Sequence, residues 1–182
     1  MFGNIHITED WTLFLDRDGV INHEKKEDYI KNWSEFKFYS ESLAALPLLA
    51  QKFNRIIITT NQKGIGKGLM SDADLNLIHL NMTNQIIQLG GRIDAIFYCS
   101  DLDNLSYNRK PQPGMAFQAK DKYPSIDFSK SMMVGNRMSD MEFGRNAGMQ
   151  TVYLATTNPE APFPDTKIDY RYDNLLQFAQ AV

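Results

Sequence analysis

Short apolar runs recur along this chain, and the stretches between them carry helical spacing. Each run is nearly free of polar residues, as strands covered on both faces of a sheet are. The runs lie at 12–15, 55–60, 93–98, 131–135 and 150–154. Because strand and helix alternate, we predict an α/β fold with a doubly wound, Rossmann-like parallel sheet and helices on both faces.

The clearest helix signal opens at Ser71, where Asp74 completes a capping box, and closes at Gly90 and Gly91. Its apolar residues recur every three or four positions, which a buried helix face explains without a cofactor. This predicted stripe consists of Leu75, Ile78, Met82, Ile86 and Leu89. Further helices are predicted at about 42–53, 114–122, 139–147 and 173–181.

The size and composition favour one soluble domain. With 182 residues, 43% apolar and 23% charged, we expect a single domain over residues 1–182. The net charge of -3 argues against a nucleic-acid partner or an anionic membrane surface. A membrane helix and a signal peptide are not expected. Since Cys99 is the single cysteine, no internal disulfide forms, and a reducing, cytoplasmic setting fits.

Polar residues suited to phosphate chemistry follow the predicted strands. They are Asp16 and Asp18, then Thr60 and Asn61, then Lys110, then Asn136 and Asp140. Parallel strands present their carboxyl ends at one edge, where such sheets bind ligands, so we expect these side chains to meet there. A carboxylate attacks a phosphoryl group only if a cation and fixed donors neutralise its charge. Lys110 and a Mg²⁺ ion would do so, with Asp16, Asp18 and Asn136 supplying oxygen ligands.

A pair of aspartates with one residue between them is a weak signal alone, because chance gives about 1.2 such pairs in a chain with 15 Asp. Three occur here. Asp72 and Asp74 belong to a helix start, and the pair at 101–103 sits in a polar loop. Asp16 and Asp18 differ because they directly follow a buried strand, whose extended end would point both carboxylates the same way.

Three segments resemble the haloacid dehalogenase superfamily of phosphatases, within its branch of histidinol-phosphate and heptose-bisphosphate phosphatases. They are 15–22 (LDRDGVIN), 60–68 (TNQKGIGKG) and 109–114 (RKPQPG), and the likeness covers roughly residues 11 to 155. The resemblance implies that Asp16 attacks phosphorus to form an aspartyl-phosphate and that Asp18 protonates the leaving oxygen, then activates water. It also implies that Thr60 and Asn61 hold phosphoryl oxygens, while Lys110 balances charge.

The resemblance to capless members implies an open cleft and no separate cap domain. The segments 19–40 and 70–91 are too short to build a cap. Loops would then select a small phosphorylated metabolite, either a sugar phosphate or bisphosphate or histidinol phosphate. Candidate substrate contacts are Asn22, His23, Tyr29 and Arg109.

The fourth motif departs from the family pattern. Members usually have Gly-Asp with a metal-binding Asp, whereas this chain has Gly135-Asn136. The neutral amide weakens a bound metal, which leaves open a second function: a catalytically weakened phosphometabolite-binding protein. Asp140, four residues on, either orients Lys110 or Asn136 from behind or favours the start of its helix.

Three other sites or functions are disfavoured. Many bacterial relatives carry a zinc loop of Cys and His before the Arg-Lys-Pro motif, but residues 99–108 hold one thiol and no His, so we predict no zinc. Gly68 follows Lys67 where a nucleotide-binding P-loop has Ser or Thr. A phosphoacceptor signalling domain shares the residue types, but its phosphorylated Asp follows the third strand, whereas Asp16 follows the first.

Overall fold

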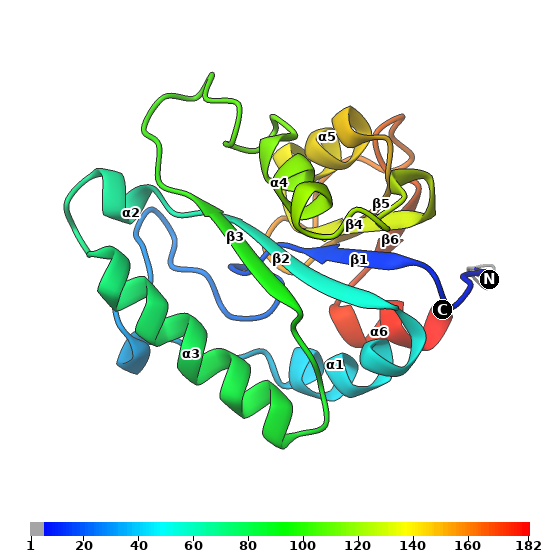
Figure 1. Cartoon of the computed structure of the whole chain (residues 1–182), viewed down its shortest axis with the longest axis horizontal. Coiled ribbons are helices and arrows are strands. Elements are labelled where there is room, and N and C mark those ends of the chain that lie inside the picture. The colour runs from blue at the N-terminus through cyan, green and yellow to red at the C-terminus, as the bar shows by residue number, and fades with distance from the viewer. Residues whose placement is uncertain (1–5) are drawn as a thin grey trace.

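In the computed structural model, which describes residues 6–182, six parallel strands form one sheet in the order β3-β2-β1-β4-β5-β6 (Figure 1). The predicted doubly wound sheet is confirmed. The strands are β1 (Thr12–Leu15), β2 (Arg55–Asn61), β3 (Ala95–Cys99), β4 (Ser131–Gly135), β5 (Gln150–Leu154) and β6 (Tyr170–Tyr172). The first five lie within two residues of the predicted runs.

The edge strand β6 was not predicted from the sequence. It has three residues and follows a proline-containing stretch that reads as a surface connection. It pairs with β5, with Val152 opposite Tyr170. Three residues are too few to display an apolar run or an alternation, so only the pairing itself reveals this strand.

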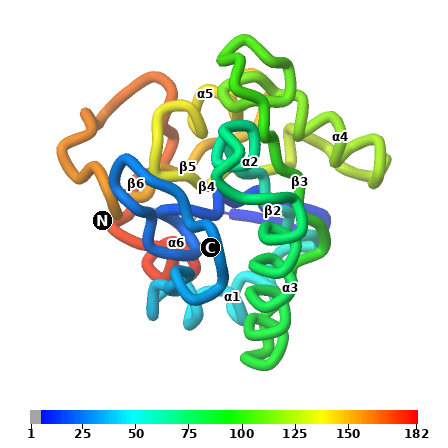
Figure 2. The backbone as a smooth tube through the Cα atoms, turned by 90° about the vertical axis from the view of Figure 1, so that its left-hand side faces the viewer, coloured from blue at the N-terminus to red at the C-terminus, as the bar shows by residue number. Residues whose placement is uncertain are grey.

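Two helical layers cover the sheet, and Figures 1 and 2 show α1, α3 and α6 on one face and α4 and α5 on the other. The helices are α1 (Ser40–Lys52), α2 (Lys63–Gly66), α3 (Asp72–Gln88), α4 (Gly114–Lys122), α5 (Met138–Ala147) and α6 (Leu175–Ala181), with short 3-10 turns η1 (Trp33–Glu35) and η2 (Phe128–Lys130). Leu13 and Leu15 of β1 pack into the core under the first layer, while Phe14 packs under the second. The two-residue period of a strand thus builds both cores.

Helix α3 keeps the predicted capping box, with the Asp74 backbone N–H donating to the Ser71 hydroxyl at 3.2 Å. Leu75, Ile78, Met82 and Ile86 are buried as predicted. Leu89 is 50% exposed, so its predicted burial is wrong, because the helix ends at Gln88. His79 is buried on this face instead.

The order of connections places the carboxyl ends of β1 and β4 at a topological switch point. From β1 the chain moves outward through β2 and β3, whereas β4 returns to the other side of β1. The loops that leave neighbouring strands in opposite directions open a crevice at this edge. Figure 1 shows the loops after β1, β2 and β3 gathered on its left side. Within residues 6–182, none of the helices is both long and apolar enough to cross a bilayer.

Candidate active site

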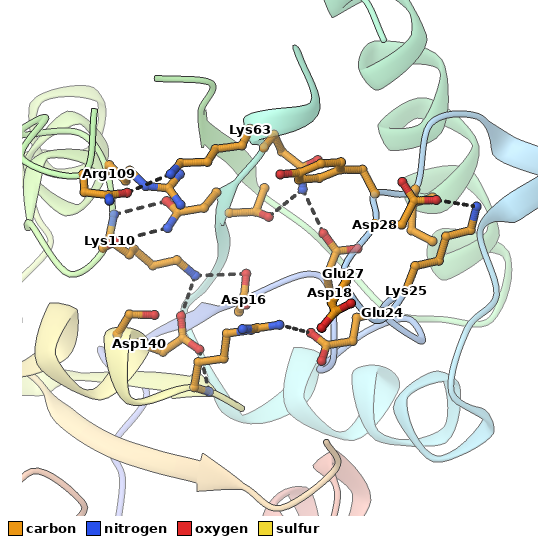
Figure 3. A pocket seen from close by; sticks show the side chains of 18 of the residues that line it. Asp16, Asp18, Glu24, Lys25, Glu27, Asp28, Lys63, Arg109, Lys110 and Asp140 are labelled. Atoms are coloured by element: carbon orange, nitrogen blue, oxygen red, sulfur yellow. Dashed lines mark hydrogen bonds and ion pairs between the residues drawn. The ribbon is translucent and has the colours of Figure 1, made fainter. Parts of the chain in front are cut away.

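A cavity of about 580 Å³ lies at this edge (Figure 3). It draws side chains from five segments: the loop after β1, the end of β2, helix α2, the loop before α4, and the start of α5. The predicted residues among its lining are Asp16, Asp18, Tyr29, Thr60, Asn61, Arg109, Lys110 and Asp140. Folding therefore brings together residues that lie more than a hundred positions apart in the chain.

Lys110 forms the centre of the cavity floor. Its Nζ lies 2.9 Å from Asp16 Oδ1 and 2.7 Å from Asp140 Oδ1, and its side chain is 2% exposed. The Asn61 amide fixes the lysine backbone by donating to the Lys110 carbonyl and accepting from its N–H, both at 3.1 Å. Burial alone would lower the pKa of Lys110, but Asp140 and Asp16 outweigh it and raise that pKa. The lysine is therefore a fixed cation.

Asp140 combines the two roles that the sequence left open. One carboxylate oxygen binds Lys110, and the other accepts the Arg137 backbone N–H at 3.0 Å, at the start of α5. A Cβ added at Gly135 would lie 2.2 Å from the Asp140 Cβ. Glycine at the end of β4 thus makes room for this carboxylate.

Asp16 faces the cavity beside the lysine. β1 ends at Leu15, so Asp16 and Asp18 stand on the following loop rather than on the strand itself, which corrects the expected basis for their common direction. Burial raises the pKa of Asp16 to about 7, opposed by the Lys110 charge and reinforced by Asp140 and Asp18.

Asp18 is held by a ring of donors. Arg17 Nη2 lies 2.9 and 2.8 Å from its two oxygens, and the Asn22 and Gln62 amides each donate at 2.9 Å. Burial alone would raise the pKa of Asp18, but the Arg17 charge and these hydrogen bonds outweigh it and lower that pKa. Gln62 also donates to Thr60 Oγ1 at 2.9 Å, which links the acid to the end of β2.

Sequence reasoning missed the roles of Arg17, Gln62 and His79. Arg17 is fully buried, and its Nη1 lies 3.2 Å from His79 Nε2 on α3. Burial and then the Arg17 charge lower the pKa of His79 to about 3, against a smaller opposing effect of Asp18. Gln62 lies inside the segment 60–68 that resembles the phosphatase family, but neither spacing nor composition marks His79 as part of a site.

The buried histidine predicts a loss of stability in acid. Its pKa is ordinarily about 6.5, so below that pH the unfolded chain binds a proton that the folded chain refuses until near pH 3. Stability is complete above this window and falls as pH decreases through it. From pH 7 to pH 5 the free energy of unfolding, measured in urea, should decrease by about 2 kcal/mol less in His79→Gln than in the unmodified protein. Met82→Leu, on the same helix face, should keep the original drop; equal drops in all three proteins would contradict the assignment.

Asn136 is fully buried and is not among the residues that line the cavity. Its Nδ2 donates to Thr157 Oγ1 at 2.8 Å, while its Oδ1 is buried without a hydrogen-bond partner within residues 6–182. A Cβ at Gly19 would lie 2.1 Å from Asn136 Nδ2, and the φ of +83° there also favours glycine. The loop after β1 can approach β4 this closely only at a residue without a side chain.

The oxygen donors here suit a hard cation. Asp16 and Asn136 follow neighbouring strands, and the Asp16 backbone N–H donates to Val134 at 3.0 Å. An unpartnered amide oxygen and a carboxylate match the oxygen preference of Mg²⁺. Among the described residues, no group of three or more His, Cys, Asp and Glu side chains is placed to hold a metal, so such an ion would rely on amide, carbonyl and phosphate oxygens as well.

Two predicted substrate contacts, Asn22 and His23, are not among the residues that line the cavity. Asn22 is fully buried and donates to Asp18 and to the His23 carbonyl, so it supports the acid instead of reaching a ligand. His23 is exposed, with its ring 3.9 Å from that of Tyr39. The buried position of Asn22 corrects the prediction for that residue, because side-chain direction in an irregular loop is not encoded by spacing, whereas the contact through His23 stays a prediction.

The chain resembles known phosphatases over most of its length. It is 34% identical to the D-glycero-alpha-D-manno-heptose-1,7-bisphosphate 7-phosphatase of Mycobacterium tuberculosis, across 94% of this chain and 91% of that protein. It is also 34% identical to the D-glycero-beta-D-manno-heptose-1,7-bisphosphate 7-phosphatase of Bordetella bronchiseptica, across 80% of this chain and 81% of that protein. A family model described as HAD-hydrolase-like matches residues 107–177.

Solved structures give the same picture. The D,D-heptose 1,7-bisphosphate phosphatase of B. bronchiseptica, complexed with magnesium and phosphate, superposes with a TM-score of 0.85 at 30% identity, covering 93% of this chain and 96% of that one. The corresponding enzyme of Burkholderia thailandensis superposes with a TM-score of 0.68 at 27% identity, with the same coverage.

Proposed function

Because the chain belongs to the haloacid dehalogenase-like phosphatases, in the branch of the heptose-bisphosphate phosphatases, we propose that it removes one phosphate from a sugar bisphosphate through a phosphorylated Asp16. The observation that carries this mechanism is the ion-paired series Asp16, Lys110 and Asp140 on the floor of an open cavity. Burial raises the pKa of Asp16, and the Lys110 ammonium opposes that rise, so the lysine favours the ionised carboxylate that meets the phosphoryl group.

The residues of the chain account for both halves of the reaction. Asp16 forms a bond to phosphorus as the ester P–O bond breaks. Asp18, which has to take up a proton first because its pKa is lowered, gives that proton to the leaving alkoxide. Asp18 then takes a proton from a water molecule, whose oxygen attacks phosphorus and releases inorganic phosphate and free Asp16. The Thr60 hydroxyl and the main-chain donor of Asn61 hold the phosphoryl oxygens during both steps, since the Asn61 side chain is bonded to the Lys110 backbone, and Lys110 offsets the phosphoryl charge.

We assign the metal ligands to Asp16, Asp18 and Asn136. The buried, unpartnered Oδ1 of Asn136 supports this assignment, as does the magnesium in the B. bronchiseptica phosphatase structure. When bound, Mg²⁺ would neutralise charge on the phosphoryl oxygens. The chain itself supplies the nucleophile, the acid and the fixed donors around them.

A second phosphate would find cations farther along the cavity. Lys63, Lys67 and Arg109 all line it, beyond the Lys110 that serves the reacting phosphate (Figure 3 labels Lys63 and Arg109). Arg109 Nη1 is buried and has no hydrogen-bond partner among the described residues, so it is available to an anion. These cations favour a sugar bisphosphate over a monophosphate, in agreement with the names of the relatives.

A substrate panel tests the proposal. We expect purified protein to release phosphate from a heptose 1,7-bisphosphate faster than from histidinol phosphate or sugar monophosphates, and to lose this activity when EDTA removes divalent metal. Adding back Mg²⁺ should restore it, since the reacting oxygens need a hard cation. Activity that is insensitive to EDTA, or confined to monophosphates, would contradict the metal or the substrate class respectively.

The amide of Asn136 also supports a second function, in which the protein binds a phosphometabolite but turns it over weakly. Asn136→Asp should lower the Mg²⁺ concentration for half-maximal activity by about tenfold, because a carboxylate attracts the cation more strongly than an amide. Titrating Mg²⁺ against phosphate release measures this, with Asn174→Asp, at the start of α6, as a control. Turnover only in Asn136→Asp, together with ligand-induced thermal stabilisation of the unmodified protein, would favour the binding function.

A further inference from the structure

A buried chain of contacts runs from helix α3 to the acid Asp18. His79 lies on the sheet-facing side of α3, and Arg17 lies between this ring and Asp18. The Arg17 side chain is completely buried, and its guanidinium carbon also lies 5.9 Å from the centroid of the Phe36 ring. The arginine is therefore enclosed by a carboxylate, an imidazole and an aromatic ring.

The chemistry of this contact determines the state of the histidine. A guanidinium group has N–H donors and no acceptor, so His79 Nε2 must accept the hydrogen bond from Arg17 Nη1. The imidazole is therefore neutral and carries its proton on Nδ1. Arg17 uses Nε and Nη2 on Asp18 and Nη1 on His79, so the two sides of its planar fork are held by different partners.

Packing alone gives no reason for a histidine at this position. The other buried residues of α3 are Leu75, Ile78, Met82 and Ile86, which are all apolar. A buried polar group is costly unless it is hydrogen-bonded, and within residues 6–182 the hydrogen bond of this ring is the one to Arg17. An apolar side chain here would leave Arg17 Nη1 without its acceptor.

We propose that His79 is a positioning residue for hydrolysis, holding Arg17 so that Arg17 keeps the Asp18 carboxylate directed at the leaving oxygen. This inference rests on the proposed function, in which Asp18 transfers the proton. Without His79, the guanidinium would lose its hydrogen bond on the Nη1 side, and Asp18 would be held less rigidly, with only Asn22 and Gln62 still fixed beside it. Neither His79 nor Arg17 needs to touch the substrate for this effect.

The test compares leaving groups. p-Nitrophenolate leaves without a proton, whereas the alkoxide from a heptose 1,7-bisphosphate needs one, and kcat/KM reports the steps up to its departure. In His79→Leu we expect kcat/KM to fall about 30-fold for the heptose bisphosphate and less than about threefold for p-nitrophenyl phosphate. His79→Gln, whose amide oxygen can accept from Arg17, should recover most of the loss. Met82→Leu is the matched packing control and should change neither value.

Each outcome has a distinct meaning. Equal losses on both substrates, or the same loss in Met82→Leu, would reduce His79 to a packing residue and overturn the inference. An unmodified protein that cleaves neither substrate would instead refute the proposed function. If His79→Leu does not fold, nitrogen-15 NMR of the unmodified protein decides: a neutral ring protonated on Nδ1 supports the inference, and a ring protonated on Nε2 overturns it.

Discussion

Replacing Asp16 by asparagine should lower kcat at least about 10⁴-fold with any phosphate ester. The amide has nearly the same size as the carboxylate but is a very poor nucleophile, so no aspartyl-phosphate forms. Lys110 would keep its second partner, Asp140, at 2.7 Å, and the fold should be retained. Steady-state phosphate release measures the loss, and thermal unfolding checks that the variant is folded.

The controls for this variant separate a lost nucleophile from a general charge effect. Asp10→Asn removes an exposed carboxylate that pairs with Lys130, outside the cavity, and should leave kcat unchanged. Acid-quenched unmodified protein should carry label from a phosphate-labelled substrate, and Asp16→Asn should carry none. Robust turnover by Asp16→Asn would rule out the covalent mechanism.

Lys110→Met should have a double effect, on catalysis and on stability. Activity should fall about 10³-fold, because a fixed charge next to the developing phosphoryl charge is lost. The free energy of unfolding should also fall by about 3 to 5 kcal/mol, since Asp16 and Asp140 would then face each other in a buried site without a cation. Urea unfolding at pH 7.5 and phosphate release measure the two effects separately.

A second substitution tells these effects apart. Adding Asp140→Asn to Lys110→Met removes the repulsion between carboxylates, so stability should return while activity does not. Lys130→Met, which breaks an exposed ion pair with Asp10, should alter neither quantity appreciably. If Lys110→Met kept full activity, Lys110 would have no part in catalysis; recovery of activity in the double variant would show that its role was only structural.

The edge at which the site assembles could be predicted because the relevant signals are local. Apolar runs at β1, β2 and β4 identify strands, and alternation with helices makes the sheet parallel. Parallel strands end at one edge, so residues just after them, such as Asp16 and Thr60, were expected to be neighbours. Lys110 was expected there as well, because it lies on the loop that follows the third strand, and the motif it shares with a known family supported this prediction.

The direction of individual side chains could not be predicted. Asn22 was expected to face substrate, but the loop after β1 turns it inward to Asp18. Asn136 was expected among the oxygen ligands, and the structure adds that Thr157 holds its amide nitrogen while its oxygen has no partner among the described residues. Spacing along an irregular loop does not fix where a side chain points, because its dihedral angles follow no repeat.

The sequence by itself therefore determined the sheet, its helical layers and the group of residues at the strand ends, since hydrophobic periodicity and the direction of the strands are properties of neighbouring residues. Only the tertiary structure decided how that group is supported. The contact between Arg17 and His79 joins residues 62 positions apart, and its partners carry no local pattern that links them. A hydrogen bond depends on distance and direction in space, and the fold supplies both only after α3 has packed against the sheet.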